Sequence, residues 1–167
     1  MLLDHVISKP KTIGGYGLHQ LVQGLTDGGS PLFVDMGEKF IVRTVKKITE
    51  TGTPPRSVTD KNVIGFELRA CVSKKLKGKH IYYPTSDWAS RHNWLKRQGE
   101  KHGFEPLTMN CRSKLAKITD GKGRKFTVDQ TDFVGVLKVL DALAFQKAVE
   151  KGVGSTAKAF GFGMLII

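Results

Sequence analysis

The sequence predicts an α+β fold of 167 residues, in which short strands alternate with three short helices. Apolar side chains make up 40% of the chain, which is enough to form a hydrophobic core. The strand candidates alternate apolar and polar residues, and the clearest helix candidate has the 3.6-residue repeat of an amphipathic helix. The length suits one large domain or two small ones.

The first half of the chain contains one predicted helix and four predicted strands. Residues 2–8 are the first strand, and YGLHQLVQGL, residues 16–25, places leucine and valine at the i, i+3, i+4 and i+7 positions of a helix. Residues 31–48 predict a hairpin that turns near Gly37, followed by a polar loop. NVIGFELRACV, residues 62–72, alternates as a fourth strand. This order resembles a ferredoxin-like unit whose second helix is lost or reduced to a loop.

The second half follows the lysine-rich segment SKKLKGK, and HIYYP, residues 80–84, predicts a new strand. The longest predicted helix lies within residues 85–103, with a Thr or Ser cap and Gly103 as its stop. Two strands flank the turn TDGKG, a helix covers residues 141–151, and MLII predicts a closing strand. This β, α, β, β, α, β order is that of a complete ferredoxin-like unit.

These elements predict two tandem ferredoxin-like (RRM-like) domains joined near residues 73–79. The N-terminal domain is expected over residues 1–75, and the C-terminal domain over residues 76–167.

Composition argues against a membrane-spanning, secreted or zinc-binding protein. No apolar run approaches the roughly 20 residues of a membrane span, and the N-terminal segment lacks a signal-peptide pattern. Cys71 and Cys111 stand alone, without the paired spacing of a zinc site. We therefore expect a cytoplasmic protein with two reduced thiols and no membrane partner.

Positive charge is concentrated in one third of the chain. The formal net charge is +12, and residues 74–125 hold 14 Lys and Arg against 4 Asp and Glu. A basic segment in an otherwise nearly neutral chain is typical of a surface that binds a polyanion such as a nucleic acid. The alternative is a basic surface that serves only solubility.

Tyr16 and His19 are the candidate catalytic residues. Projected at 100° per residue, they fall together on the face of the predicted helix opposite the leucine stripe. Imidazole titrates near neutrality and can move a proton, and a phenol can orient or protonate a neighbouring oxygen. The alternative is a solvated histidine without a role. No acidic residues cluster in a metal-binding motif, so cleavage of RNA would use the 2′-hydroxyl of the substrate as nucleophile, with no metal or other cofactor.

Two further stretches are candidates for binding RNA. GVGSTAKAFGFG, residues 152–163, matches neither a Walker loop nor a dinucleotide-binding loop, because its glycines follow a helix and precede a strand. A loop of this kind can hold phosphates with backbone amides and a lysine. The second stretch is the basic hairpin around TDGKG, whose alternate residues share a strand face. The candidate RNA-binding residues are Gly152, Gly154, Lys158, Gly161 and Gly163 in the loop, and Arg112, Lys114, Lys117, Lys122, Arg124 and Lys125 in the hairpin.

Four stretches, in order along most of the chain, resemble one family. YGLH is similar to its Tyr-x-x-His, GFELRACVSKK to its FxLRANPxK strand, WASRHNWLKRQGEKHGF to its AxWLxRRxxxxGF helix, and KGVGSTAKAFGFGMLII to its closing glycine-rich loop and strand. The family is that of the CRISPR-associated endoribonucleases that process repeat RNA, of the CasE type in the RAMP superfamily. In this chain three residues separate Gly154 and Lys158, where the commoner family pattern has two.

The resemblance implies two ferredoxin-like domains that bind the stem-loop of a CRISPR repeat and cut its 3′ side without a metal. His19 would be the general acid or base, Tyr16 its partner, and Lys158 with the surrounding glycines would hold the RNA backbone. The products would carry a 2′,3′-cyclic phosphate and a 5′-hydroxyl, and the protein would keep the crRNA as a subunit of a CRISPR effector complex such as Cascade. Two alternatives remain at this stage: a stem-loop-binding subunit that does not cut, and a general RNA-binding protein of ferredoxin-like fold.

Overall fold

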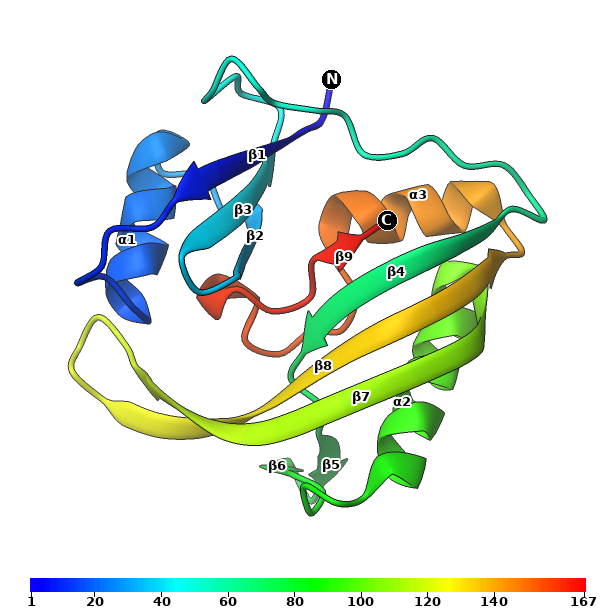
Figure 1. Cartoon of the computed structure of the whole chain (residues 1–167). Coiled ribbons are helices and arrows are strands. Elements are labelled where there is room, and N and C mark those ends of the chain that lie inside the picture. Colours follow the sequence, from blue (N-terminus) through cyan, green and yellow to red (C-terminus); the bar gives the residue numbers. More distant parts are fainter.

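The computed structural model describes all 167 residues and contains two antiparallel sheets and a small separate ribbon (Figure 1). The predicted α+β class is confirmed. The elements of the first part are β1 Leu3–Ser8, α1 Tyr16–Leu25, β2 Leu32–Asp35 and β3 Lys39–Thr44. Those of the second part are β4 Val63–Ala70, β5 Lys74–Leu76, β6 Lys79–Ile81, α2 Trp88–His102, β7 Phe104–Thr119, β8 Lys125–Val139, α3 Ala142–Lys151, the 3₁₀-helix η1 Lys158–Phe160 and β9 Leu165–Ile166.

The first sheet has the order β1-β3-β2, and both strand pairs are antiparallel. The amphipathic face predicted for residues 16–25 packs on it, because Leu18 and Val22 share a buried cluster with Phe33, Phe40 and Val42. The chain from residue 45 to 62 then runs without a helix. Its one pairing with the sheet is a bridge between Thr53 and Asp4 at the outer edge of β1.

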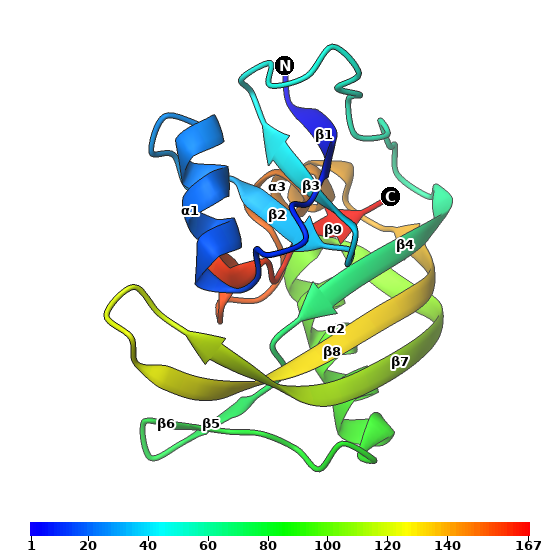
Figure 2. The same ribbon diagram turned by 60° about the vertical axis from the view of Figure 1, so that its left-hand side comes forward.

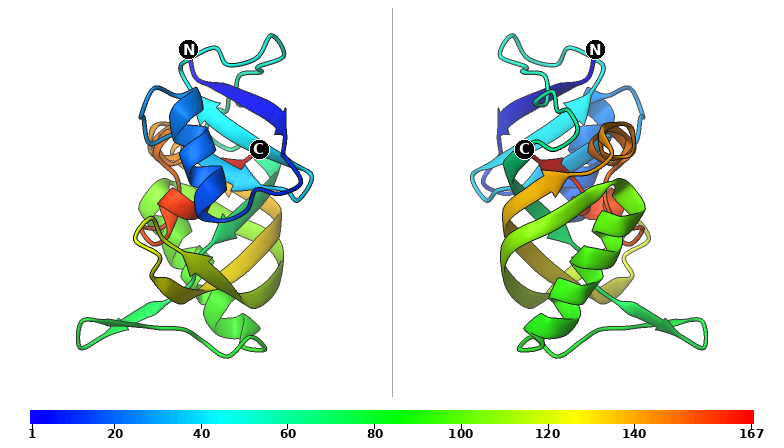
Figure 3. Two further views of the ribbon diagram at one scale, coloured as in Figure 1. Left: turned by 90° about the vertical axis from the view of Figure 1, so that its left-hand side faces the viewer. Right: turned by 90° about the vertical axis from the view of Figure 1, so that its right-hand side faces the viewer.

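The second sheet has the order β7-β8-β4-β9, and α2 and α3 cover one of its faces (Figures 1 and 3). Its core is a cluster of 16 buried residues, including Phe66 and Leu68 of β4, Trp94 of α2 and Phe145 of α3. The hairpin predicted around TDGKG is present as β7 and β8, which pair from Phe104↔Val139 to Thr119↔Lys125.

The predicted place of β4 is wrong. β4 pairs with β8 from Val63↔Lys138 to Ala70↔Thr131, and with β9, so it belongs to the second sheet. The change from one sheet to the other therefore falls between Thr44 and Val63, earlier than the boundary predicted at residues 75 and 76. The alternating pattern of β4 reveals a half-buried strand, but it does not reveal which distant strand pairs with it.

Two smaller predictions about the second half are also corrected. Residues 79–81 form β6, but they pair only with β5 in the ribbon and not with the main sheet. The cap of α2 is Asp87, whose side chain accepts a hydrogen bond from the Ser90 amide at 3.0 Å. Gly103 ends this helix in the left-handed conformation, φ 74°, as predicted.

Arg43 of β3 joins the first sheet to the second part of the molecule. Its guanidinium is buried, forms a bidentate pair with Asp4 at 2.6 and 2.7 Å, and donates to the carbonyl oxygens of Val149 and Leu165, both at 2.8 Å. One side chain thus ties β1 and β3 to the end of α3 and to β9. This tie fixes α1, which packs on the first sheet, relative to the loop that follows α3.

A second buried ion pair holds the start of α2. Arg91 and Asp129 of β8 are both fully buried and pair directly, and the Arg91 guanidinium also donates to the Thr131 hydroxyl at 3.0 Å.

None of the three helices is long and apolar enough to cross a membrane.

Candidate functional site

Tyr16 and His19 lie together at the N-terminal end of α1, as their spacing predicts. Gly15, at φ 53°, leads into the helix, so Tyr16 begins its first turn. The ring centroids of Tyr16 and His19 are 5.8 Å apart, and both side chains are half-buried while Leu18 faces the core. This end of α1 presents a phenol and an imidazole side by side at the surface.

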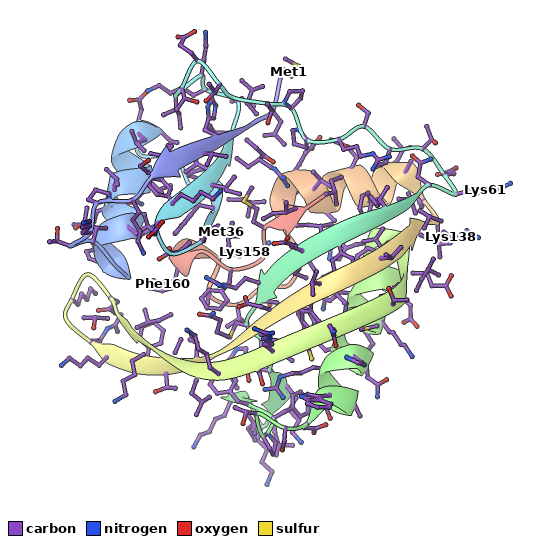
Figure 4. All side chains as sticks on the ribbon, in the orientation of Figure 1. Met1, Met36, Lys61, Lys138, Lys158 and Phe160 are labelled. Atoms are coloured by element: carbon purple, nitrogen blue, oxygen red, sulfur yellow. The ribbon has the colours of Figure 1, made fainter.

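The structure brings two other segments to this pair. Phe160 of η1 lies 6.2 Å from the His19 ring, and Phe126 of β8 lies edge-on to Phe160 at 5.5 Å. The tip of the β7–β8 hairpin curves toward α1 (Figure 2), and a side chain at Gly121 in its turn would collide with the Tyr16 phenol. Figure 4 labels Phe160 beside α1 and the hairpin tip. The site is therefore assembled from α1 near the start of the sequence, the β7–β8 hairpin, and η1 near the end.

His19 and Lys158 line the same cavity, which has a volume of about 400 Å³. Its wall also includes Gln23 of α1, Ser30 of the following loop and Glu150 of α3. Polar groups from four segments thus face one space, large enough for a small part of a bound chain to enter.

Lys158 has a structural partner within the protein. Its Nζ donates to the carbonyl oxygen of Lys151, the last residue of α3, at 2.7 Å. A cation at the C-terminus of a helix is favourable because the free carbonyl groups carry partial negative charge. Burial lowers the pKa of the Lys158 ammonium, and the nearby charge of Lys101 lowers it further. In this conformation Lys158 caps α3 at the edge of the His19 cavity.

Three of the four glycines predicted to bind RNA are buried and are used by the protein itself. Gly152, Gly161 and Gly163 have φ angles of 82°, 88° and 91°, which glycine adopts at little cost. Their amides donate to the carbonyl oxygens of Ala148, Lys158 and Arg69, at 2.8, 3.2 and 2.7 Å respectively. The expectation that these amides hold phosphates is corrected, because each already has an acceptor inside the fold.

Residues 154–156 of this loop differ from the three buried glycines, because their amides are not used by the fold. Gly154, at φ 79°, is half-buried against the Trp94 ring, and the amides of Gly154, Ser155 and Thr156 have no acceptor within the protein. Ala157 takes the left-handed conformation, φ 61°. Free amides next to a left-handed residue are typical of backbone concavities that accept anions. Within residues 152–163, the segment 154–156 is thus the part that can hold a phosphate.

The basic hairpin separates into two regions. Its candidate residues are all exposed: Arg112, Lys114, Lys117, Lys122, Arg124 and Lys125. Arg112 and Lys114 line two adjoining grooves of about 490 and 440 Å³ between the sheets, whereas Arg124 and Lys125 follow the turn that reaches Tyr16. Five residues of strand, about 17 Å, separate Lys114 from that turn. Arg124 is paired with Asp120 at 2.6 Å, which leaves Lys122 and Lys125 as the unpaired cations at the tip.

Sequence reasoning missed Phe160, Phe126 and Gly121, because no pattern links an aromatic ring in a glycine-rich loop to a helix at the other end of the chain. The single available signal is the position of Phe160 inside AFGFG, where glycines force the chain to turn.

No group of three or more His, Cys, Asp and Glu side chains is arranged to hold a metal ion.

The chain belongs to the CRISPR-associated protein family, whose model, described as "CRISPR associated protein", matches residues 29–167. Tyr16 and His19 lie before the matched segment. A comparison with curated protein sequences finds no match.

Solved structures of similar fold cover nearly the whole chain. Thermus thermophilus Cse3 bound to an RNA representing a pre-cleavage complex has a TM-score of 0.74 at 20% identity, over 98% of this chain and 96% of that one. The CRISPR-associated protein Cas6e from Escherichia coli K-12 has a TM-score of 0.74 at 22% identity, over 99% and 97%. A chain of a CRISPR RNA-guided surveillance complex has a TM-score of 0.66 at 16% identity, over 98% and 97%.

Proposed function

We propose that the protein is a CRISPR repeat-specific endoribonuclease that needs no metal and cuts precursor crRNA at the 3′ side of the repeat stem-loop. The observation that carries this proposal is the contact of His19 with Tyr16 and Phe160 beside the tip of a basic hairpin. Membership of the CRISPR-associated family and the shared fold with RNA-bound Cse3 support it. We propose that the fold consists of two ferredoxin-like units. The first unit lacks its second helix, and in place of its fourth strand it has only the bridge between Thr53 and Asp4 at the edge of β1.

In this proposal His19 moves a proton during cleavage. In the proposed reaction the 2′-hydroxyl loses its proton and attacks the adjacent phosphorus, the bond from phosphorus to the 5′-oxygen breaks, and that oxygen takes up a proton. The products are a 2′,3′-cyclic phosphate and a 5′-hydroxyl. A neutral imidazole can accept the first proton, an imidazolium can supply the second, and the Tyr16 phenol can donate a hydrogen bond to a phosphate oxygen. The Phe160 ring limits the positions open to the His19 ring.

The RNA would lie across the hairpin tip and the glycine-rich loop. Lys122 and Lys125 at the tip, and the free amides of residues 154–156 in the loop before η1, are groups that can bind phosphate. Arg112, Lys114 and Lys117 extend the positive surface along β7. Retention of the product as a subunit of an effector complex is supported by the fold shared with a chain of the surveillance complex.

The test is cleavage of end-labelled CRISPR repeat RNA from the same locus in EDTA, beside copies with a 2′-deoxy nucleotide at each candidate position. We expect one cut that survives EDTA and disappears with a single deoxy substitution. A cut that needs a divalent ion, or that survives every deoxy substitution, would contradict the proposed chemistry.

A second candidate function is a stem-loop-binding subunit that does not cut. It is favoured by the Lys158 ammonium, which in this structure donates to the Lys151 carbonyl oxygen and is thereby held at the end of α3. Tight binding of the repeat with no product in the same assay would establish this second function in place of the first.

A further inference from the structure

The β5–β6 ribbon is an exposed two-stranded hairpin that projects from the body of the molecule (Figure 3). β5 and β6 pair through Lys74↔Ile81, Lys75↔His80 and Leu76↔Lys79, and all six strand residues are exposed. Its turn is Lys77-Gly78, with φ angles of 48° and 78°. Positive φ at both turn residues is the geometry that matches the twist of a tight hairpin. The ribbon is thus a formed element with no side packed on a core.

The base of the ribbon is fixed to the β7–β8 hairpin. Tyr82, directly after β6, packs against a buried cluster that contains Cys71, Ile118 of β7 and Val128 of β8. Burial in this cluster raises the pKa of the Cys71 thiol to about 11. The Lys74 ammonium lies 5.6 Å from the centre of the Tyr83 ring. These contacts hold the ribbon at a defined place beside the outer part of the hairpin.

The ribbon carries four lysines within six residues, Lys74, Lys75, Lys77 and Lys79, and no acidic residue. None of the four forms a salt bridge, whereas seven Lys and Arg side chains elsewhere in the molecule do. In the free protein the four neighbouring cations repel one another. A bound polyanion would neutralise them and would release its own counterions to the solvent.

The ribbon points to the same side of the molecule as the proposed RNA site. In Figures 2 and 3 the ribbon, the tip of the β7–β8 hairpin and α1 all project to one side, and the hairpin tip lies between the other two. RNA that starts at His19 and crosses the hairpin tip would therefore reach the ribbon next. We propose that the ribbon binds the phosphate backbone of the repeat stem on the side of the hairpin remote from the scissile bond. This inference rests on the proposed function.

The test compares the salt dependence of binding between the wild-type protein and the triple variant K75Q/K77N/K79Q. Asparagine is chosen at position 77 because it tolerates the left-handed conformation. The probe is the repeat stem-loop, with 2′-deoxy nucleotides at the candidate cleavage positions so that it stays intact. Each lost phosphate contact lowers the slope of log affinity against log salt by about 0.7 to 1. We expect the slope to fall by about 2 to 3 and the Kd at 0.1 M salt to rise about 10- to 100-fold.

Two control variants separate a ribbon contact from a general loss of charge. K75R/K77R/K79R keeps the charges and should bind like the wild type. K47Q/R56Q/K147Q removes three exposed cations elsewhere and should change the slope by less than about 1. An RNA whose stem is shortened at the end remote from the cut should bind the wild type and the ribbon variant equally.

The outcomes distinguish this inference from the proposed function. A ribbon variant with wild-type affinity and slope, or equal losses in the ribbon and the distant variants, would overturn the inference while cleavage remains intact. An acidic protein surface would then be the partner that the lysines fit. A wild-type protein that binds the repeat no better than an unrelated hairpin and makes no product would instead overturn the proposed function.

Discussion

The ring of Phe160, near the end of the sequence, lies 6.2 Å from the ring of His19, near its start. This contact depends on two sets of interactions that hold the two parts of the molecule together. Glycines with positive φ turn the chain after α3, and the buried Arg43 side chain joins the first sheet to α3 and β9. The position of the candidate catalytic group is therefore set by residues far from it in sequence.

Replacing His19 with alanine should slow cleavage by about 10²- to 10⁴-fold and leave RNA affinity nearly unchanged, because a positioned acid or base contributes about that much. Single-turnover cleavage in EDTA and a binding titration measure the two effects. His92, half-buried on α2, offers a matched control, and its replacement by alanine should leave the rate unchanged. Cleavage at the wild-type rate by the His19 variant would remove this residue from the mechanism.

Phe160→Leu should lower the cleavage rate about 10-fold and change affinity less, because the smaller side chain leaves the His19 ring free to take other positions. Phe126→Leu is the control, since Phe126 contacts Phe160 but is not among the aromatic neighbours of His19. Equal single-turnover rates for the two variants would show that Phe160 does not orient the imidazole.

Gly163→Ala should lower the free energy of unfolding by about 2 to 4 kcal/mol. A Cβ there would lie 2.8 Å from the Val153 carbonyl oxygen, and φ is 91°. Gly123→Ala has a similar φ of 76° with no atom nearby, so it should cost about 1 kcal/mol. Denaturant unfolding of both variants separates the strain of positive φ, which they share, from the collision with the Val153 carbonyl oxygen, which only Gly163→Ala has. Equal losses in the free energy of unfolding would argue against that collision.

Arg43→Met should lower the free energy of unfolding by about 3 to 5 kcal/mol, because it leaves the partly buried Asp4 carboxylate and two buried carbonyl oxygens without their donor. Lys46→Met breaks an exposed pair with Asp27 and should change stability by less than about 1 kcal/mol. Unfolding curves give both values. A cost for Arg43 as small as that for Lys46 would mean that this side chain does not hold the two parts together.

Stability should fall as the pH rises above 9. Burial raises the pKa of Cys71 from 9.0 to about 11, so the folded protein keeps a proton that the unfolded chain releases. This difference lowers the free energy of unfolding by up to about 2 to 3 kcal/mol between pH 9 and 11. Burial also raises the pKa of Tyr82, to about 12, so part of the decline should remain in Cys71→Ala. Parallel pH curves for the variant and the wild type would contradict the assignment to Cys71.

Local patterns in the sequence were sufficient to predict most elements. The leucine repeat predicted α1, and TDGKG predicted the turn between β7 and β8, because both depend on neighbours in the chain. The partner of β4 was not predictable in this way. Ile64, Phe66 and Leu68 require one buried face, and that requirement is met equally well by either sheet.

The candidate site was predictable only in part, for a similar reason. Tyr16 and His19 are neighbours on one helix, so their spacing alone places them together. The glycine cluster correctly indicated an unusual backbone, but positive φ angles do not say whether the close neighbour is a ligand or the protein itself. For Gly161 that neighbour is the Phe33 ring, and for Gly152 it is the carbonyl oxygen of Gly163.

The distribution of the site along the chain also sets the order in which it is made during translation. His19 and its helix are synthesised early, the basic hairpin later, and Phe160 with the glycine-rich loop last. Since domains fold as they emerge, starting from the N-terminus, a nascent chain would possess an RNA-attracting surface before it possesses an ordered imidazole. If the protein cuts RNA as proposed, an incomplete chain could already capture RNA, whereas cutting would await the final residues of the sequence.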